Sequence, residues 1–184
     1  MRYPLVIRVL QDVWADKARK RISPEEVSAC CKRLVETIQG TYEPDIVIAI
    51  AAGGSAPGEL IAQMLDISVV HLTIRRDINI PRRYSLDPIP MRWIMSIYHH
   101  FLFQTTKPTV SVNITADISG KKVLIVDDFL HTRATVEVAV EYLRKAGVSE
   151  AKVATLSYVS TKKPDFSALP RGNYSFPWSR DYAE

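Results

Sequence analysis

Two adjacent aspartates, Asp127 and Asp128, end a run of aliphatic residues and are followed closely by a histidine, two threonines and an arginine. The stretch reads KKVLIVDDFLHTRAT over residues 121–135. The free backbone N–H groups at the start of a helix attract a phosphate, and the hydroxyls of Thr132 and Thr135 add donors. Carboxylates repel that phosphate, so they suit a cation or the neutral hydroxyls of a ribose. The stretch therefore predicts a sugar-phosphate site, with the diol on the acids and the phosphate in the turn.

The simplest structural role for such acids is to cap the helix that follows. One aspartate would serve that purpose, so two of them at the end of an apolar run favour ligand binding. A second candidate is the loop Ala52-Gly53-Gly54-Ser55, which follows another apolar run and precedes a helical pattern. Its glycines allow close approach of an anion to the backbone. On its own the loop is weak evidence, because a Gly-Gly pair is also typical of a plain turn and neither standard phosphate-loop motif is present.

Both stretches lie at the ends of predicted strands. Continuous apolar runs at 45–51 and 122–128 are typical of strands buried on both faces. The helix at 23–40 has a capping-box start, with Ser23 as N-cap. The remaining elements are strands at 68–74, 109–114 and 151–159 and helices at 56–65, 90–104 and 132–147, with 109–114 as half of a hairpin that turns near Ser119-Gly120. This alternation predicts an α/β fold with a mainly parallel sheet, in which ligands bind at the carboxyl ends of the strands.

The composition is that of one globular domain, with 184 residues, 47% hydrophobic and 24% charged. No apolar run approaches the roughly 20 residues needed to cross a membrane, and the first residues show no signal-peptide pattern. Cys30 and Cys31 are neighbours in a helical pattern and are unsuited to a framework disulfide, which favours a reducing cytoplasm. The net charge is +4, and the basic clusters lack aromatic interleaving. We therefore expect a cytoplasmic protein that binds a small anion and has neither a membrane nor a nucleic-acid partner.

Three motifs resemble one known family. VLIVDDFLHTRAT (123–135) resembles the phosphoribosyl-pyrophosphate (PRPP) motif of type I phosphoribosyltransferases, and IAIAAGGSAPGELIAQML (48–65) is similar to the family's pyrophosphate loop and following helix. YSFPWSRDY (174–182) is similar to the ending of the xanthine/guanine and fungal xanthine branches. The resemblance covers residues 23–184. It implies the type I fold, with a core over about 23–160, a small hood from the terminal segments 1–22 and 160–184, and a mobile loop or insertion over 76–118.

The resemblance also implies an activity. The enzyme would transfer a phosphoribosyl group from Mg²⁺-PRPP to xanthine, hypoxanthine or guanine, and release pyrophosphate and a nucleoside 5′-monophosphate, as in purine salvage. We expect a homodimer or higher homo-oligomer. A non-catalytic regulator that senses PRPP or a nucleotide with the same fold stays open as an alternative. A receiver domain, which also begins with paired aspartates, is disfavoured because only 56 residues follow Asp128.

The residue roles that the resemblance implies fall into four groups. Catalysis is assigned to Asp127, Asp128 and His131, where the two acids hold the ribose hydroxyls, stabilise positive charge on the ring and hold Mg²⁺ directly or indirectly. The other groups are the 5′-phosphate cradle (His131, Thr132, Arg133, Ala134, Thr135), the pyrophosphate loop (Ala52, Gly53, Gly54, with a cis peptide at Ala52–Gly53) and the base site (Lys162, Tyr174, Phe176, Trp178). The segment around 75–84 corresponds to the loop that closes over the reaction.

Four positions depart from the family pattern. His131 stands where purine enzymes have an aspartate base, and we expect it to bind phosphate, because a neighbouring phosphate favours the imidazolium form. Arg133 replaces the usual glycine, and it would be strained if the turn needs a positive φ. Ala52 stands at a position that is commonly basic, and Ser179 stands where an aspartate is common.

Overall fold

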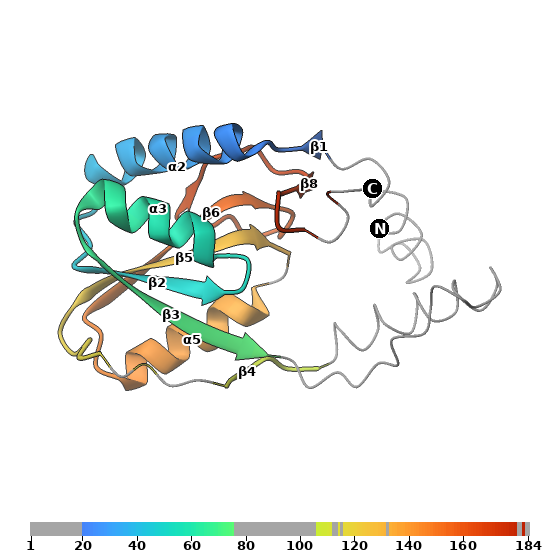
Figure 1. Cartoon of the computed structure of the whole chain (residues 1–184). Helices are drawn as coiled ribbons and strands as arrows, with labels where there is room; N and C mark the ends of the chain where they lie inside the picture. Colours follow the sequence, from blue (N-terminus) through green and yellow to red (C-terminus); the bar gives the residue numbers. More distant parts are fainter. Residues whose placement is uncertain are drawn as a thin grey trace.

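The computed structural model of the chain describes residues 20–75, 106–111, 114, 116–131, 133–179 and 182. The expected helix at 90–104, most of the expected mobile loop, the first 19 residues and Thr132 lie outside these ranges. In the described part, a six-stranded sheet lies between helices (Figure 1). Its strands, in spatial order, are β4 (Thr109–Val110), β3 (Ser68–Arg75), β2 (Ile46–Ala51), β5 (Lys122–Leu130), β6 (Glu150–Tyr158) and β7 (Phe166–Ser167).

The strands are added to the sheet outward in two opposite directions, and these directions meet between β2 and β5. From β2 the chain moves to β3 on one side, and from β5 it moves to β6 on the other, while β2 and β5 pair in parallel. Open α/β sheets bind their ligands outside the carboxyl ends of the strands at such a switch point. The loop after β2 and the acidic end of β5 therefore lie next to each other at the edge where a ligand is expected.

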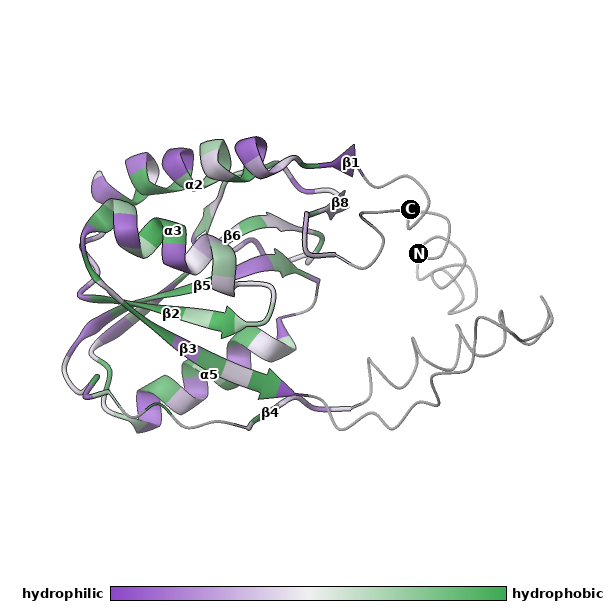
Figure 2. Ribbon diagram, viewed as in Figure 1, coloured by the Kyte–Doolittle hydropathy of each residue, from purple (hydrophilic) through white to green (hydrophobic). Residues whose placement is uncertain are grey.

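Helices cover both faces of the sheet, which explains the uninterrupted apolar runs of the central strands. Helices α2 (Pro24–Gln39) and α3 (Ser55–Leu65) pack on one face, and α5 (Ala134–Lys145) packs on the other (Figure 1). Successive residues of β5 alternate between the two cores: Leu124 and Val126 pack toward α2, and Val123 and Ile125 toward α5. The helices themselves carry hydrophilic residues on their outer sides (Figure 2).

The predicted elements are confirmed wherever the structure describes them, with one exception. Helix α2 begins with the expected capping box, in which Ser23 Oγ accepts from the Glu26 N–H at 3.2 Å and Glu26 Oε2 accepts from the Ser23 N–H at 2.8 Å. The predicted hairpin at 109–114 is wrong. Strand β4 has two residues and pairs antiparallel with β3, since its Val110 lies opposite Ile74.

The segments at the two ends of the described chain meet beside the sheet. Strand β1 (Lys20–Arg21) pairs in parallel with β8 (Tyr174–Ser175), and the Ile22 N–H donates to the Ser175 carbonyl at 2.9 Å. This pairing anchors the aromatic tail close to the carboxyl edge of β5 (Figure 1). In the part of the chain that the structure describes, no helix is long and apolar enough to cross a membrane.

Candidate active site

The glycine loop and the acidic strand end are in direct contact. A Cβ added to Gly53 would lie 2.5 Å from Cγ of Asp128, so the bare backbone of the loop covers that carboxylate. A Cβ on Gly54 would lie 2.8 Å from the Ile50 carbonyl oxygen and 3.0 Å from Cα of Asp127. Both glycines are therefore required for the close approach of the two strand ends. A cis peptide joins Ala51 and Ala52, one bond before the position expected from the sequence.

The aromatic tail reaches the same carboxylate from the other side. The indole N–H of Trp178 donates to Asp128 Oδ2 at 2.6 Å. The Trp178 ring stacks on Phe176 with a centroid distance of 5.6 Å and an interplanar angle of 14°. Phe176 is 1% exposed and belongs to the core, whereas Trp178 is 36% exposed. The structure thus brings a residue expected at the base site into contact with one expected at the ribose site.

Asp127 lies in a different environment from its neighbour. Burial, and in second place the negative charge of Asp128, raise the pKa of the Asp127 carboxyl well above its ordinary value. The backbone N–H of Asp128 donates to Asp127 Oδ1 at 3.0 Å and opposes this shift. A carboxyl with a raised pKa keeps its proton to higher pH and can then donate as well as accept a hydrogen bond.

Helix α5 begins directly after the acidic strand. Ala134 and Thr135 form its first turn, and Arg133 precedes it with φ −74° and ψ −8°. Arg133 therefore has ordinary helical dihedrals, and an arginine at the usual glycine position is not strained. Its Nη1 donates to the Lys163 carbonyl at 3.3 Å, and its Nε lies 3.9 Å from a carboxylate oxygen of Glu137. Arg133 thereby connects the start of α5 to the loop that follows β6.

The other expected site residues differ in exposure. His131 is exposed, and its ring centroid lies 6.3 Å from that of Phe129. Lys162 is exposed in the loop after β6, and Tyr174 is half-buried in β8. Ser179 closes the turn below Trp178, because its N–H donates to the Phe176 carbonyl at 2.8 Å and its Oγ accepts from the Phe176 N–H at 3.1 Å.

Two further features of this site were not among the sequence-based predictions. The bond between Trp178 and Asp128 joins residues 50 positions apart, and no local pattern predicts it. Thr155 of β6 is fully buried opposite Asp127 in the strand register, and its hydroxyl has no hydrogen-bond partner among the described residues. A threonine within an apolar strand is a signal that could have been noticed.

The described residues do not form a complete metal site by themselves. They contain no group of three or more histidine, cysteine, aspartate or glutamate side chains placed to hold a metal ion. Mg²⁺ prefers six oxygen ligands and commonly keeps several waters and substrate phosphates. The two carboxylates at the end of β5 fit Mg²⁺ only as part of such a shell, in which substrate oxygens and water supply most ligands.

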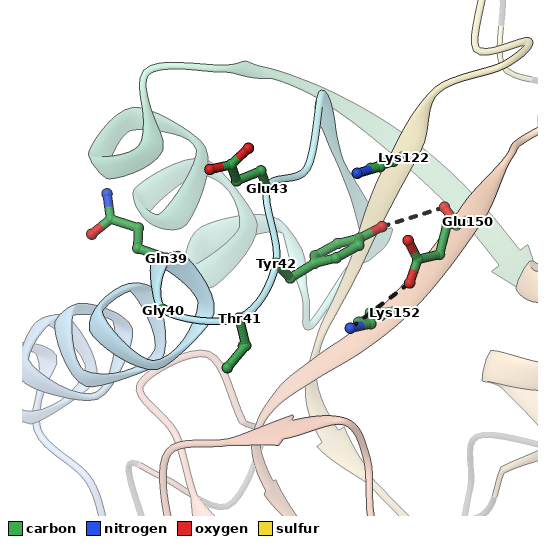
Figure 3. A pocket seen from close by; sticks show the side chains of 8 residues that line it. All are labelled: Gln39, Gly40, Thr41, Tyr42, Glu43, Lys122, Glu150 and Lys152. Atoms are coloured by element: carbon green, nitrogen blue, oxygen red, sulfur yellow. Dashed lines mark hydrogen bonds and ion pairs between the residues drawn. The ribbon is translucent and has the colours of Figure 1, made fainter.

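A separate cavity of about 380 Å³ lies at the opposite edge of the sheet, between the end of α2 and the starts of β5 and β6 (Figure 3). Several of its polar groups have partners within the protein. Lys152 lies 3.7 Å from Glu150 and 4.6 Å from the centre of the Tyr42 ring, and the Tyr42 hydroxyl donates to the Val123 carbonyl at 3.1 Å. The cavity therefore contains no unpaired buried group that would select a ligand, and the carboxyl edge remains the candidate site.

Comparisons with known proteins agree with this geometry. The phosphoribosyl transferase domain family matches residues 21–179. The chain is 25% identical over 150 residues to the hypoxanthine-guanine phosphoribosyltransferase of Schizosaccharomyces pombe, covering 74% of this chain and 65% of that protein. It is 28% identical over 153 residues to xanthine phosphoribosyltransferase 1 of Saccharomyces cerevisiae, covering 76% and 66%. The chain thus spans just under two thirds of the length of these curated relatives.

Solved structures show the same architecture. The purine phosphoribosyltransferase of Pyrococcus horikoshii superposes with a TM-score of 0.67 at 25% identity, covering 88% of this chain and 93% of that one. The xanthine-guanine-hypoxanthine phosphoribosyltransferase of Helicobacter pylori superposes with a TM-score of 0.63 at 14% identity, covering 90% and 96%, which supports the fold alone. The expected type I phosphoribosyltransferase fold is confirmed. With a family match that covers its whole described core, and relatives from the purine branch, the chain belongs to the phosphoribosyl transferase domain family.

Proposed function

We propose that the protein transfers the phosphoribosyl group of Mg²⁺-PRPP to a purine base, namely xanthine, hypoxanthine or guanine. One observation supports this more than any other: the Gly53 loop, the acidic end of β5 and Trp178 converge on a single carboxylate at the switch point of the sheet. A sugar diphosphate needs a backbone anion site, hydroxyl acceptors and a base platform close together. The three segments supply these three functions from three parts of the chain.

In this proposal the paired acids bind the ribose. The Asp128 carboxylate accepts a hydrogen bond from one hydroxyl, and Asp127, with its raised pKa, donates to or accepts from the other. As the bond from C1′ to pyrophosphate lengthens, positive charge develops on the ring, and nearby negative charge stabilises it. Ala52 and Gly53 present backbone N–H groups to the departing pyrophosphate. The Gly54 N–H already donates to the Ile50 carbonyl at 2.8 Å, so Gly54 contributes to this loop through the close backbone approach that its missing side chain allows.

The start of α5 binds the 5′-phosphate. The free N–H groups around Ala134 and Thr135 and the positive end of the helix dipole favour an anion there. His131 is exposed at the entrance of this turn and contributes to phosphate binding rather than to proton abstraction. Thr132, which lies between His131 and Arg133, completes the cradle.

The tail and the loop after β6 form the base site. Among Tyr174, Phe176 and Trp178, the ring of Trp178 is the most exposed, and the buried ring of Phe176 stacks on it. Tyr174 in β8 adds a half-buried ring to this site, and Lys162, which is exposed in the loop after β6, would approach an exocyclic oxygen of the purine. Arg133 holds the backbone of the loop next to that lysine.

Mg²⁺ enters this proposal as part of the substrate complex. Bound to PRPP, it neutralises charge on the pyrophosphate leaving group. The oxygens of Asp127 and Asp128 would form hydrogen bonds with the ribose hydroxyls and with water in the outer shell of the ion.

By family resemblance we propose a homodimer or higher homo-oligomer, which light scattering coupled to size-exclusion chromatography tests. A cytoplasmic location agrees with Cys30 and Cys31, which are both free and buried.

Thermal-shift and calorimetric titrations with PRPP, with and without Mg²⁺, test the proposal directly. Binding at 100 times the dissociation constant should stabilise the fold by about 2.7 kcal/mol. Incubation with hypoxanthine, guanine or xanthine should then yield pyrophosphate and the corresponding nucleoside 5′-monophosphate. Absence of any shift with PRPP and with 5′-nucleotides contradicts the proposal, and a shift without product from any base favours the non-catalytic regulator.

A further inference from the structure

The carboxylate of Asp128 is fixed from two sides by segments that are remote in sequence. The backbone of Gly53 covers one side so closely that even a methyl group would not fit. The indole N–H of Trp178 approaches from the other side and donates to Oδ2 at 2.6 Å. Hydrogen bonds from a donor to an ionised carboxylate are shorter and about twice as strong as neutral ones. The orientation of this carboxylate is therefore set by the protein and not by a ligand.

The donor itself is firmly anchored. The Trp178 ring stacks on Phe176, which is 1% exposed and part of the core. The two hydrogen bonds between Ser179 and the Phe176 backbone close the turn that carries the indole. Strand β8 pairs with β1 directly before this turn. The position of the N–H thus depends on the core and on the tail, and it does not require a bound base.

We propose that Trp178 is a positioning residue for Asp128, in addition to its expected contact with the base. Its N–H occupies Oδ2 and thereby directs the remaining lone pairs of the carboxylate, including those of Oδ1, to a ribose hydroxyl of PRPP. This inference rests on the proposed function for the identity of the ligand. It makes Trp178 a residue that serves both substrates: the face of the ring serves the base, and the edge of the ring serves the ribose through Asp128.

The variant Trp178→Phe separates the two roles, because phenylalanine keeps an aromatic face and lacks the N–H. We expect kcat/KM for PRPP to fall roughly tenfold or more, since a hydrogen bond to a charged group is lost. The KM for the base should change by less than about threefold, because a stacking ring remains. The control Ser179→Ala loosens the same turn but keeps the indole, and it should affect PRPP less than Trp178→Phe does. Equal losses for PRPP and base in Trp178→Phe, or unchanged PRPP kinetics, would overturn the inference.

A measurement without substrate keeps the test independent of the proposed function. The indole N–H proton of Trp178, assigned by its loss in Trp178→Phe, should resonate downfield of a solvent-exposed indole and exchange slowly with water. In Asp128→Asn this proton should shift and exchange faster. If these signatures are present while PRPP does not bind, the proposed function fails and the contact stands. If the proton exchanges freely in the unaltered protein, the contact does not exist in solution and the inference is refuted.

Discussion

The carboxyl of Asp127 should lower the free energy of unfolding as the pH rises. A variant with a side chain that does not titrate at this position should lack this effect. Burial and the neighbouring charge of Asp128 raise its pKa in the folded protein well above the ordinary value of about 3.9. Between these two pKa values the unfolded chain has released the proton and the folded protein still holds it. Raising the pH therefore favours the unfolded chain, and the free energy of unfolding falls by up to about 1.4 kcal/mol per pH unit.

The variant Asp127→Asn has a side chain of nearly the same shape that does not titrate. Its amide oxygen can still accept the hydrogen bond that the Asp128 N–H donates to Asp127 Oδ1 at 3.0 Å in the unaltered protein. We expect it to be more stable than the unaltered protein at pH 7. The difference between the two should be small below about pH 4 and should grow as the pH rises above the unfolded pKa.

Urea denaturation between pH 4 and 8, in buffer with a chelator, measures this difference. Glu36→Gln, which removes a carboxylate from the exposed side of α2, controls for the loss of one negative charge. A difference for Asp127→Asn that stays flat over this range, or that reverses sign as the pH rises, would refute the assignment of a raised pKa to Asp127.

Three further predictions concern other parts of the molecule. Gly53→Ala should lower kcat/KM for PRPP roughly 10- to 100-fold, because its Cβ displaces the Asp128 carboxylate. In the control Gly40→Ala the new Cβ lies 3.9 Å from its nearest neighbour at φ −77°, and urea denaturation should show about 0.4–1 kcal/mol of added stability. Burial raises the pKa of Cys31 to about 12 from 9.0, so thiol labelling at pH 8 should be slow in the folded protein and become fast in urea. Tyr42→Phe removes a buried hydrogen bond to the start of β5 and should cost about 1 kcal/mol in the same denaturation assay, whereas an unchanged midpoint would show that the bond contributes nothing.

Much of the architecture was predictable because local and global signals agree. The runs at β2 and β5 are apolar throughout, since helices cover both faces of the sheet. The capping box at Ser23 predicted the start of α2 to the residue. Two-residue strand β4 was predicted with the wrong partner, because an edge strand of this length carries no pairing information beyond its β propensity.

The site was predictable in its parts and not in its connections. The acids and the glycine loop were recognisable because each lies at the end of a buried strand, and the sheet topology then places them side by side. The sequence left open whether Arg133 is strained. The answer depends on where α5 begins, and since Arg133 already has helical dihedrals, no glycine is needed there. The contact between Trp178 and Asp128 depends on the pairing of β1 with β8, which no local pattern reveals.

The contact between Trp178 and Asp128 also has a consequence for biosynthesis. Trp178 is added to the growing chain 50 residues after Asp128. At a translation rate of about 5–20 residues per second, this separation corresponds to a delay of roughly 3–10 s. During that interval the nascent chain contains the acidic strand and the glycine loop without the indole that orients the carboxylate. The ribosome therefore synthesises this part of the site in two stages, and the site is complete only after the tail has been added.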